Sequence, residues 1–204
     1  MSPPSPRPSP TLLPHDLIPL LLSSDASIYP SPLTLTTLTS WIRAAPTHAL
    51  SYQCPHTSAL AGVVVALPLR ARFFTLVSAG VIKEWEIASE MISPSEEAVG
   101  GVHIWHVERY AGWRREWGRF GDAVMEDLGL AGEARWSAMC VTEKGRGMMR
   151  RFGGREGEYK GQVVVGGVLM EREEWEGSAS AGETEGEGVM IIGGGEEEVH
   201  AIAQ

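Results

Sequence analysis

Apolar residues recur at two spacings along the chain, and each spacing predicts one kind of element. Over residues 33–45, Leu35, Leu38 and Trp41 return every three positions, which predicts an amphipathic helix. The same spacing predicts four further helices, over residues 16–23, 72–87, 120–128 and 143–152. Gly129 follows the third of these directly, as expected of a residue that ends a helix.

Runs of β-branched and aromatic residues predict the strands. The run over 59–69 is apolar on both faces, so we expect it in the interior of a sheet. Further strands are expected over 49–53, 102–110 and 136–142, followed by a hairpin of 156–159 and 162–172. Helices thus alternate with strands. This order is typical of an α/β (mixed α+β) domain with crossover helices, here with a C-terminal antiparallel hairpin.

The two ends of the chain differ in composition from the part between them. Nine of the thirteen prolines fall within residues 3–32, and proline at this density removes amide donors and forbids regular helix. We therefore expect residues 1–11 to be a disordered leader rich in proline and serine. Residues 12–175 form the expected domain. Residues 176–204, dominated by Gly, Ser, Ala and Glu, are expected to be an acidic low-complexity tail.

The formal net charge of -9 comes from one end of the chain. Residues 171–204 hold ten glutamates and one arginine, so the remainder of the chain is neutral. Within that remainder, residues 109–160 carry eleven basic and eight acidic groups. A neutral body argues against a general nucleic-acid-binding protein, which has a broad basic surface. A locally basic segment remains compatible with a focused anion site.

The composition also indicates the cellular compartment in which the protein is expected. Two cysteines provide neither a disulfide framework nor the spacing of a zinc site. No apolar run approaches the roughly 20 residues that a membrane-spanning helix requires. The first ten residues lack the apolar segment of a signal peptide. We therefore expect a soluble protein of the cytoplasm, with the nucleus as the alternative, and no membrane partner.

Three stretches of sequence carry a resemblance to a known family. The first is the strand over 102–110 followed by Arg115-Glu-Trp-Gly118-Arg-Phe-Gly121. The second is Ser137-Ala-Met-Cys-Val-Thr142, and the third is 143–153 followed by Glu-Gly-Glu-Tyr. With the order of elements given above, the chain resembles the GNAT-type acyl-CoA N-acyltransferase superfamily over residues 15–172. The resemblance implies a GNAT-like central mixed sheet.

The same resemblance implies acetyl-CoA as co-substrate and no metal. In this family the loop after the strand cradles the pyrophosphate with backbone amides, and the next strand splays to admit the pantetheine arm. In this chain the second small residue of that loop comes one position later than in the family pattern. The residues that the resemblance assigns to the co-substrate are Val107, Arg109, Arg114, Arg115, Gly118, Arg119, Phe120, Gly121 and Cys140.

Physical chemistry supports an anion site at this place independently of the family. A strand, a glycine turn and a helix start bring free amides and the positive end of a helix together. Arg114, Arg115 and Arg119 add guanidinium groups that pair with phosphate in a forked geometry. Basic residues of the helix over 143–152 would extend the site towards the 3′-phosphate. The alternative is that these arginines form the solvated faces of two helices.

Acyl transfer to an amine requires a proton acceptor for that amine. Alternation along the strand over 102–110 places Ile104, His106 and Glu108 on one face. It places His103, Trp105, Val107 and Arg109 on the other face. Glu108 and His106 are the candidate proton relay, and the alternative is that His106 packs in the core while Glu108 pairs with an arginine. A metal site formed by His103 and His106 is excluded, because their spacing sends the two side chains to opposite faces of a strand.

The family's usual acid towards the thiolate is a tyrosine on the last helix, but Met149 occupies the matching position here. Tyr159 is the candidate substitute, with Tyr110 as a second. Cys140 is a nucleophile only in principle, and a buried core residue is the preferred interpretation.

Four tryptophans fall near the expected site. They are Trp105, Trp113, Trp117 and Trp136. Their side chains either line a pocket for the acceptor amine or belong to the hydrophobic core, and the core is the preferred interpretation.

The expected activity is therefore that of an N-acetyltransferase, in which an acetyl group passes directly from acetyl-CoA to an amine. The alternative is a GNAT-like domain with little or no catalysis that acts as a ligand-binding or interaction module. The missing tyrosine and the shifted glycine favour that alternative. Neither the acceptor amine, the acyl chain preference nor the oligomeric state follows from the sequence.

Overall fold

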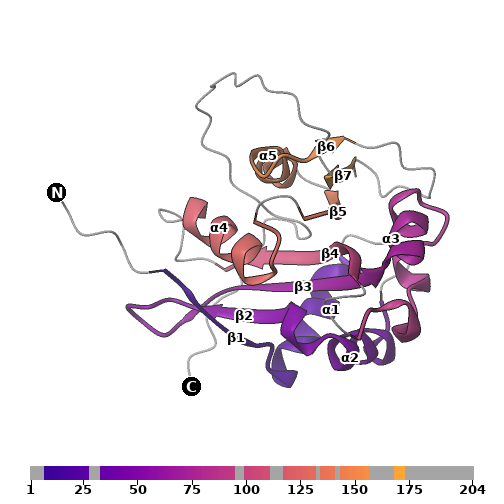
Figure 1. Ribbon diagram of the computed structural model, residues 1–204. Coiled ribbons are helices and arrows are strands. Elements are labelled where there is room, and N and C mark those ends of the chain that lie inside the picture. The colour runs from indigo at the N-terminus through magenta and orange to yellow at the C-terminus, as the bar shows by residue number, and fades with distance from the viewer. Residues whose placement is uncertain are drawn as a thin grey trace, which may run out of the picture.

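A mixed β-sheet runs through the molecule with helices on both of its faces (Figure 1). The computed structural model describes residues 7–27, 33–94, 99–110, 117–131, 134–140, 143–156 and 168–172. Within them the sheet has seven strands, in the order β1-β2-β3-β4-β5-β7-β6. The strands are β1 (Ser9–Leu12), β2 (Ala49–Gln53), β3 (Leu60–Arg70), β4 (Val99–Arg109), β5 (Trp136–Cys140), β6 (Arg155–Glu156) and β7 (Val168–Arg172).

Every neighbouring pair in the sheet is antiparallel except β4 and β5. A parallel pair needs a crossover connection, and here the crossover contains helix α4 (Trp117–Asp127). The other α-helices are α1 (Ile18–Ala26), α2 (Leu35–Ala44), α3 (Ala71–Ser78) and α5 (Glu143–Arg151). The predicted fold class, a mixed sheet with a crossover helix and an antiparallel C-terminal strand pair, is confirmed.

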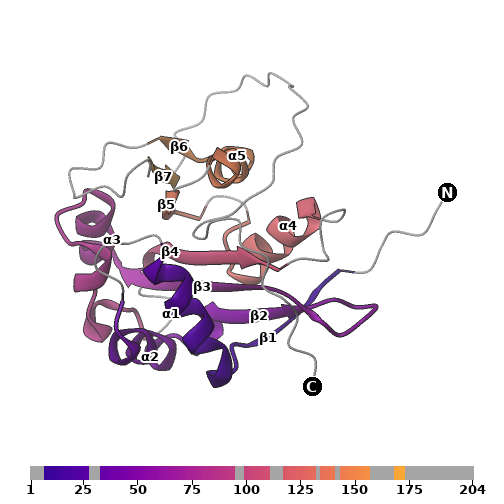
Figure 2. The same ribbon diagram turned by 180° about the vertical axis from the view of Figure 1, so that it is seen from behind.

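The helices divide between the two faces of the sheet. Seen from behind, α1 lies in front of β3 and β2, whereas α4 lies on the opposite face (Figure 2). Two apolar clusters fill the two interfaces, which we call the α4-side and the α2-side cluster. The α4-side cluster includes Leu50, Val64, Ile104, Val107, Phe120, Met125, Leu128, Leu130, Trp136 and Met148. The α2-side cluster includes Ile18, Leu21, Leu38, Trp41, Val63, Val65, Leu67, Phe74, Val77 and Trp105.

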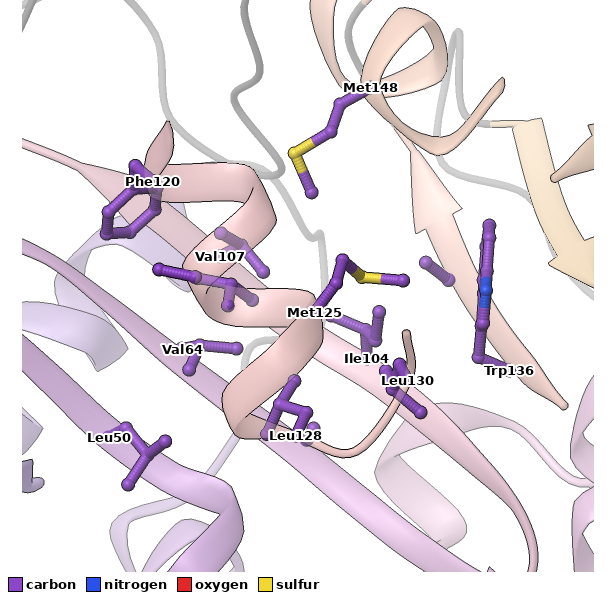
Figure 3. Packing of buried hydrophobic residues seen from close by; sticks show 14 of the residues in the cluster. Leu50, Val64, Ile104, Val107, Phe120, Met125, Leu128, Leu130, Trp136 and Met148 are labelled. Carbon is purple, nitrogen blue, oxygen red and sulfur yellow. The ribbon is translucent and has the colours of Figure 1, made fainter. Parts of the chain in front are cut away.

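Strand β3 is apolar on both faces because it contributes to both clusters. Val63, Val65 and Leu67 face α1 and α2, whereas Val64 and Ala66 face α4. Figure 3 shows the α4-side cluster, in which side chains of α4 lie over those of β3 and β4. The interior position predicted for residues 59–69 is therefore confirmed.

Two side-chain contacts of Trp41 hold α2 against the rest of the domain. Its indole packs edge-on against Trp105 of β4, with ring centroids 5.7 Å apart and an interplanar angle of 74°. Its Nε1 donates a hydrogen bond of 2.7 Å to the carbonyl of Ile87. The indole is fully buried, and a buried N–H group without an acceptor would destabilise the fold. This hydrogen bond supplies that acceptor.

The N-terminal part of the chain is more ordered than its proline content predicts. We expected a disordered leader over residues 1–11, but Ser9–Leu12 forms the edge strand β1, paired with β2. An edge strand tolerates Pro10 because one side of its backbone needs no ladder partner. Arg7 pairs with Glu126 and Asp127 at the end of α4. Residues 1–6 and the expected tail lie outside the described residues.

Several boundaries differ from those predicted. The helix expected over 72–87 is only α3, because Gly80 adopts a positive φ of 68° and turns the chain. Two short 3-10 helices follow it, η3 (Glu84–Glu86) and η4 (Ser89–Met91). Strand β4 begins at Val99, three residues before the start of the strand predicted over 102–110. The helix expected from residue 120 begins at Trp117.

Candidate functional site

A β-bulge at Trp105 interrupts the regular alternation of β4. Along the antiparallel pairing with β3, Ile104 lies opposite Ala66 and His106 lies opposite Val65. Trp105 is therefore an extra residue in β4. A bulge of this kind re-aims the side chains that follow it, and bulges are common beside functional sites.

The bulge makes part of the face assignment from the sequence wrong. His103 pairs with Leu67 and His106 with Val65, and both partners belong to the α2-side cluster. His103 and His106 therefore share one face, and Ile104 lies on the other. The prediction that the strand separates these two histidines is therefore wrong. The described residues nevertheless hold no group of three or more His, Cys, Asp or Glu side chains suited to a metal ion.

The residues proposed as a proton relay lie together at the end of β4. His106 Nε2 is 3.2 Å from Glu108 Oε2, and the hydroxyl of Tyr110 donates to the same oxygen at 3.4 Å. The His106 side chain is buried, whereas Glu108 keeps 18% of its side chain exposed. Glu108 and Tyr110 are thus the partly exposed members of a short chain of three polar groups, and His106 is the buried one. Burial is the main cause that raises the pKa of Tyr110, and the negative charge of the neighbouring Glu108 raises it further. The phenol therefore stays protonated at neutral pH.

A second buried carboxyl group faces this chain from α1. Asp25 is 2% exposed and accepts a hydrogen bond of 2.6 Å from the backbone N–H of Leu33. Burial raises the pKa of Asp25, and the charges of His106 and Glu84 act on it in opposite directions. The α2-side face of β4 is therefore lined by several ionisable groups within an otherwise apolar layer.

Strands β4 and β5 separate part-way along their length. Their parallel pairing covers Val102–Ile104 against Trp136–Ala138. Beyond Ile104, β4 keeps β3 as a partner, and β5 stays paired with β7 to Cys140. Among the described residues, β5 forms no ladder pair with Val107. Beyond Ile104 no described ladder pair joins the facing edges of β4 and β5; we call this unpaired stretch the wedge, and His106 and Glu108 are residues of β4 along it.

The N-terminus of α4 follows β4 in sequence and begins at Trp117. Gly118 and Arg119 lie in its first turn, where backbone N–H groups lack an acceptor within the helix. The amides expected to belong to a loop thus belong to a helix. Phe120 does not face solvent: its ring is buried and packs edge-on against Tyr52, with centroids 5.1 Å apart.

Gly121 is a packing residue rather than a turn residue. A Cβ at this position would lie 3.0 Å from the sulfur of Met148, so the missing side chain lets α4 and α5 approach closely. The shifted glycine of the sequence motif therefore has a local structural reason. Its role in holding an anion stays a prediction.

The arginines of α5 pair with carboxylates in this structure. Arg150 contacts Glu143 at 2.9 Å and Glu156 at 2.6 Å, and Arg151 contacts Asp122 at 2.9 Å. Arg146 also contacts Glu143 at 2.8 Å. Such contacts are typical of a solvated helix face. They agree with the alternative given in the sequence analysis, in which these arginines do not bind phosphate.

Two residues singled out for chemistry lie in the α4-side cluster. Cys140 is fully buried, and burial raises the pKa of its thiol to about 12. Such a thiol is almost entirely protonated at neutral pH, which argues against a nucleophilic role. Met149, at the position where the family has a tyrosine, is also fully buried and apolar.

Several predicted site residues lie outside the described residues: Arg114, Arg115, Tyr159 and Trp113. Of the other tryptophans, Trp105 and Trp136 are buried in opposite clusters, so they do not line a common pocket.

Sequence reasoning missed a second polar network on the same face of β4. His103 Nδ1 is 2.9 Å from Ser137 Oγ, and His103 Nε2 is 2.7 Å from Glu84 Oε1. All three side chains are buried. The residues are 19 and 34 positions apart, and only the pairing of β4 with β5 and the position of η3 bring them together. No local motif signals this arrangement.

A cavity of about 800 Å³ lies at the other end of β4. Its walls include Val99–Val102, the end of α4 from Glu126, and Arg135. The Glu126 and Asp127 carboxylates there pair with Arg7, and the Arg135 guanidinium stacks on Phe74. The cavity is thus separate from His106 and Glu108, and we place the candidate site by the wedge and the polar chain.

Known structures resemble this chain in fold. The GNAT-like decarboxylase GphF in complex with isobutyryl-CoA aligns with a TM-score of 0.56 at 15% identity, over 81% of this chain and 98% of that one. Naa50 of Arabidopsis thaliana, in complex with the bisubstrate analogue CoA-Ac-MVNAL, aligns with a TM-score of 0.51 at 9% identity, over 82% and 99%. The loading GNATL domain of CurA from Lyngbya majuscula aligns with a TM-score of 0.51 at 9% identity, over 82% and 98%.

No protein-family model matches the chain, and no curated protein matches it in sequence. At identities of 15% and below, the structural likeness establishes the fold alone. The chain has the GNAT fold, as the sequence resemblance implied. Among the described residues, no helix has both the length and the apolar composition required to span a membrane.

Proposed function

We propose that this protein is an acyl-CoA-dependent N-acetyltransferase that transfers an acetyl group directly to an amine. The observation that carries the proposal is the position of the His106–Glu108–Tyr110 chain along the wedge between β4 and β5. Two solved proteins of the same fold are complexes with CoA compounds, namely isobutyryl-CoA and a CoA bisubstrate analogue. Both the geometry and the fold therefore support an acyl-CoA substrate in the wedge.

The residues around the wedge suit such a substrate. We propose that the backbone of Val107 on the β5 side contacts the amide groups of a pantetheine arm, because the described part of β5 forms no ladder pair with it; Arg109 is the other β4 residue proposed to contact the co-substrate. The first turn of α4, with Gly118 and Arg119, offers amides to the pyrophosphate. Arg114 and Arg115 are proposed to add positive charge. A bound acetyl-CoA would supply the activated acetyl group.

Glu108 is the proposed proton acceptor for the incoming amine. Its side chain is 18% exposed, and its carboxylate already accepts from Tyr110. His106 Nε2, 3.2 Å from the same carboxylate, would donate to it while it is ionised and so hold it in position to receive the proton. Tyr110 remains protonated and orients the carboxylate. Tyr159 is proposed as the group that protonates the leaving thiolate, because Met149 has no proton to give.

The competing proposal is a GNAT-like module that binds a ligand without turning it over. The complete burial of Met149 among apolar side chains favours it, because the residue at the position of the family's usual acid has no proton to give. This proposal shares the acyl-CoA site with the first but needs no proton relay.

Calorimetry and a turnover assay separate the two proposals. The N-acetyltransferase requires acetyl-CoA binding and release of free CoA that depends on an added amine, tested with a panel of primary amines and peptide N-termini. Binding without amine-dependent release supports the module. Absence of acetyl-CoA binding at millimolar concentration contradicts both.

A further inference from the structure

The buried network of Ser137, His103 and Glu84 has the connectivity of a nucleophile, a base and an orienting acid. Ser137 is on β5, His103 is its direct partner on β4, and Glu84 reaches the imidazole from η3. In hydrolases and acyltransferases such a constellation is recognised by the roles of its members and not by their sequence order. The relay proposed above uses none of the three.

The hydrogen bonds determine the tautomer of a neutral His103, that is, which ring nitrogen carries the hydrogen. An ionised Glu84 can only accept, so the proton of the imidazole is on Nε2, which donates to Oε1 at 2.7 Å. Nδ1 then carries the lone pair and accepts from the Ser137 hydroxyl at 2.9 Å. The serine proton is therefore already directed at a base that a carboxylate holds in place.

The position of Ser137 in the sheet connects it with the wedge. The last β4–β5 pair is Ile104 with Ala138, so Ser137 lies one residue before the strands separate. The side chain of Ser137 is on the same face as His103, and the wedge opens directly beyond it. An acyl group that enters the wedge between the strands would bring its carbonyl carbon towards this hydroxyl.

We propose that Ser137, His103 and Glu84 form a second reactive site, one that attacks the acyl group of a thioester. Ser137 Oγ would form a C–O bond with the carbonyl carbon while the C–S bond breaks. The hydroxyl proton would pass to His103 Nδ1 and then to the departing thiolate, which gives a free thiol and an acylated serine. Water, with His103 again taking the proton, would release the acid and restore Ser137. The net reaction is hydrolysis of an acyl thioester.

This site is closed in the ligand-free fold, because Ser137 is fully buried and His103 is 2% exposed. Its chemistry therefore depends on a small electrophile that enters through the wedge. The inference rests on the proposed acyl-CoA site for its natural substrate, but a small reactive probe tests the serine without CoA.

The test is labelling of the full chain with a small alkyl fluorophosphonate, followed by intact mass measurement and peptide mapping. We expect one phosphonyl group per chain on the peptide containing Ser137, and none in Ser137→Ala. The variant Glu84→Gln keeps the shape of the network but removes the charge, so labelling should slow by about 100-fold, the size of a general-base contribution. The matched control is Ser51→Ala, because Ser51 is equally buried but is hydrogen-bonded to Thr11 instead of a histidine.

A second measurement links the site to thioesters. Release of CoA from acetyl-CoA in the absence of any amine should fall in Ser137→Ala and stay unchanged in Ser51→Ala. If the wild-type chain takes no label, or if Ser137→Ala is labelled to the same extent, the network is a structural one and the inference is overturned. Because labelling needs no CoA, its failure alone leaves the N-acetyltransferase proposal intact. A chain that labels at Ser137 but does not bind acetyl-CoA contradicts only the N-acetyltransferase proposal.

Discussion

His103 and His106 lie on the same face of β4, although an odd number of positions separates them. In a regular strand they would point to opposite faces, and the extra residue Trp105 reverses this. As a result, two polar networks lie side by side under α1 and α2. One ends at the partly exposed Glu108, and the other is closed around Ser137.

Glu108→Gln should reduce turnover while leaving acetyl-CoA binding unchanged. The amide keeps the size of the side chain but cannot take a proton from the amine, so we expect kcat to fall by about 100-fold or more. Steady-state kinetics and calorimetry measure the two effects. Glu90→Gln, an exposed carboxylate on η4, is the matched control. Equal kcat for both variants would show that Glu108 is not the proton acceptor.

The two cysteines should differ sharply in their reactivity. Burial raises the pKa of the Cys140 thiol to about 12, whereas Cys54 is half-buried in the turn after β2. Because the thiolate is the reactive form, an alkylating reagent at pH 8 should modify Cys54 and spare Cys140 in the folded protein. Mass spectrometry before and after denaturation counts the modified thiols. Rapid modification of Cys140 in the folded chain would contradict its place in the α4-side cluster.

Gly62→Ala should destabilise the fold through a steric clash with Phe120. A Cβ at Gly62 would lie 2.5 Å from the Phe120 ring and 2.6 Å from the backbone carbonyl oxygen of Glu108. Because a backbone atom is involved, side-chain motion alone does not relieve the clash, and we expect a loss of about 1–3 kcal/mol in the free energy of unfolding.

A second glycine provides the control for this substitution. A Cβ at Gly147 on α5 meets no atom within 4 Å, so Gly147→Ala should stabilise the helix by about 0.5–1 kcal/mol. Urea denaturation of both variants compares the two free energies of unfolding. A Gly62→Ala variant as stable as the wild type would be inconsistent with this packing of Phe120 on β3.

Asp25→Asn should change how stability depends on pH. Burial raises the pKa of Asp25 in the folded state above its value in the unfolded chain. The folded state therefore binds the proton more tightly, and stability is lost as the pH rises through the raised pKa. The asparagine does not titrate and still accepts from the Leu33 N–H through its carbonyl. Relative to the wild type, the variant should become more stable as the pH rises above about 4, the ordinary pKa of an aspartic acid.

Urea denaturation at several pH values measures the difference between the two proteins. Asp16→Asn is the control, because Asp16 is an exposed residue of the 3-10 helix before α1. A difference between wild type and Asp25→Asn that stays constant over this pH range would contradict the assigned direction of the pKa shift.

The elements that follow from periodicity alone were predicted well. Strand β2 matches its predicted range, and the interior position of β3 follows from a run that is apolar in every register. Helix α3 was predicted too long because the apolar stripe continues past Gly80, where backbone conformation and not hydrophobicity ends the helix. Strand β1 was missed because proline suggests disorder, although a sheet edge accepts it.

The candidate site depended on features that local patterns do not encode. The contact between His106 and Glu108 needs only strand spacing, and both residues were named from the sequence. The bulge at Trp105 leaves no local signal, because an inserted residue looks like any other residue of an apolar strand. The Ser137–His103–Glu84 network depends on the pairing of strands that are far apart in sequence.

The parallel pairing of β4 with β5 has a further consequence for how the domain opens. Strands β1 to β4 form one antiparallel unit, and β5, β7 and β6 form another. Within the part of the chain that the structure describes, three residue pairs of β-ladder join the two units, and helices packed on one face of the sheet support this junction. Amide hydrogens of β3, which has a partner along both edges, should exchange only on global unfolding. Those of β5 and β7 should exchange earlier, through an opening in which the C-terminal unit detaches while the N-terminal unit stays folded.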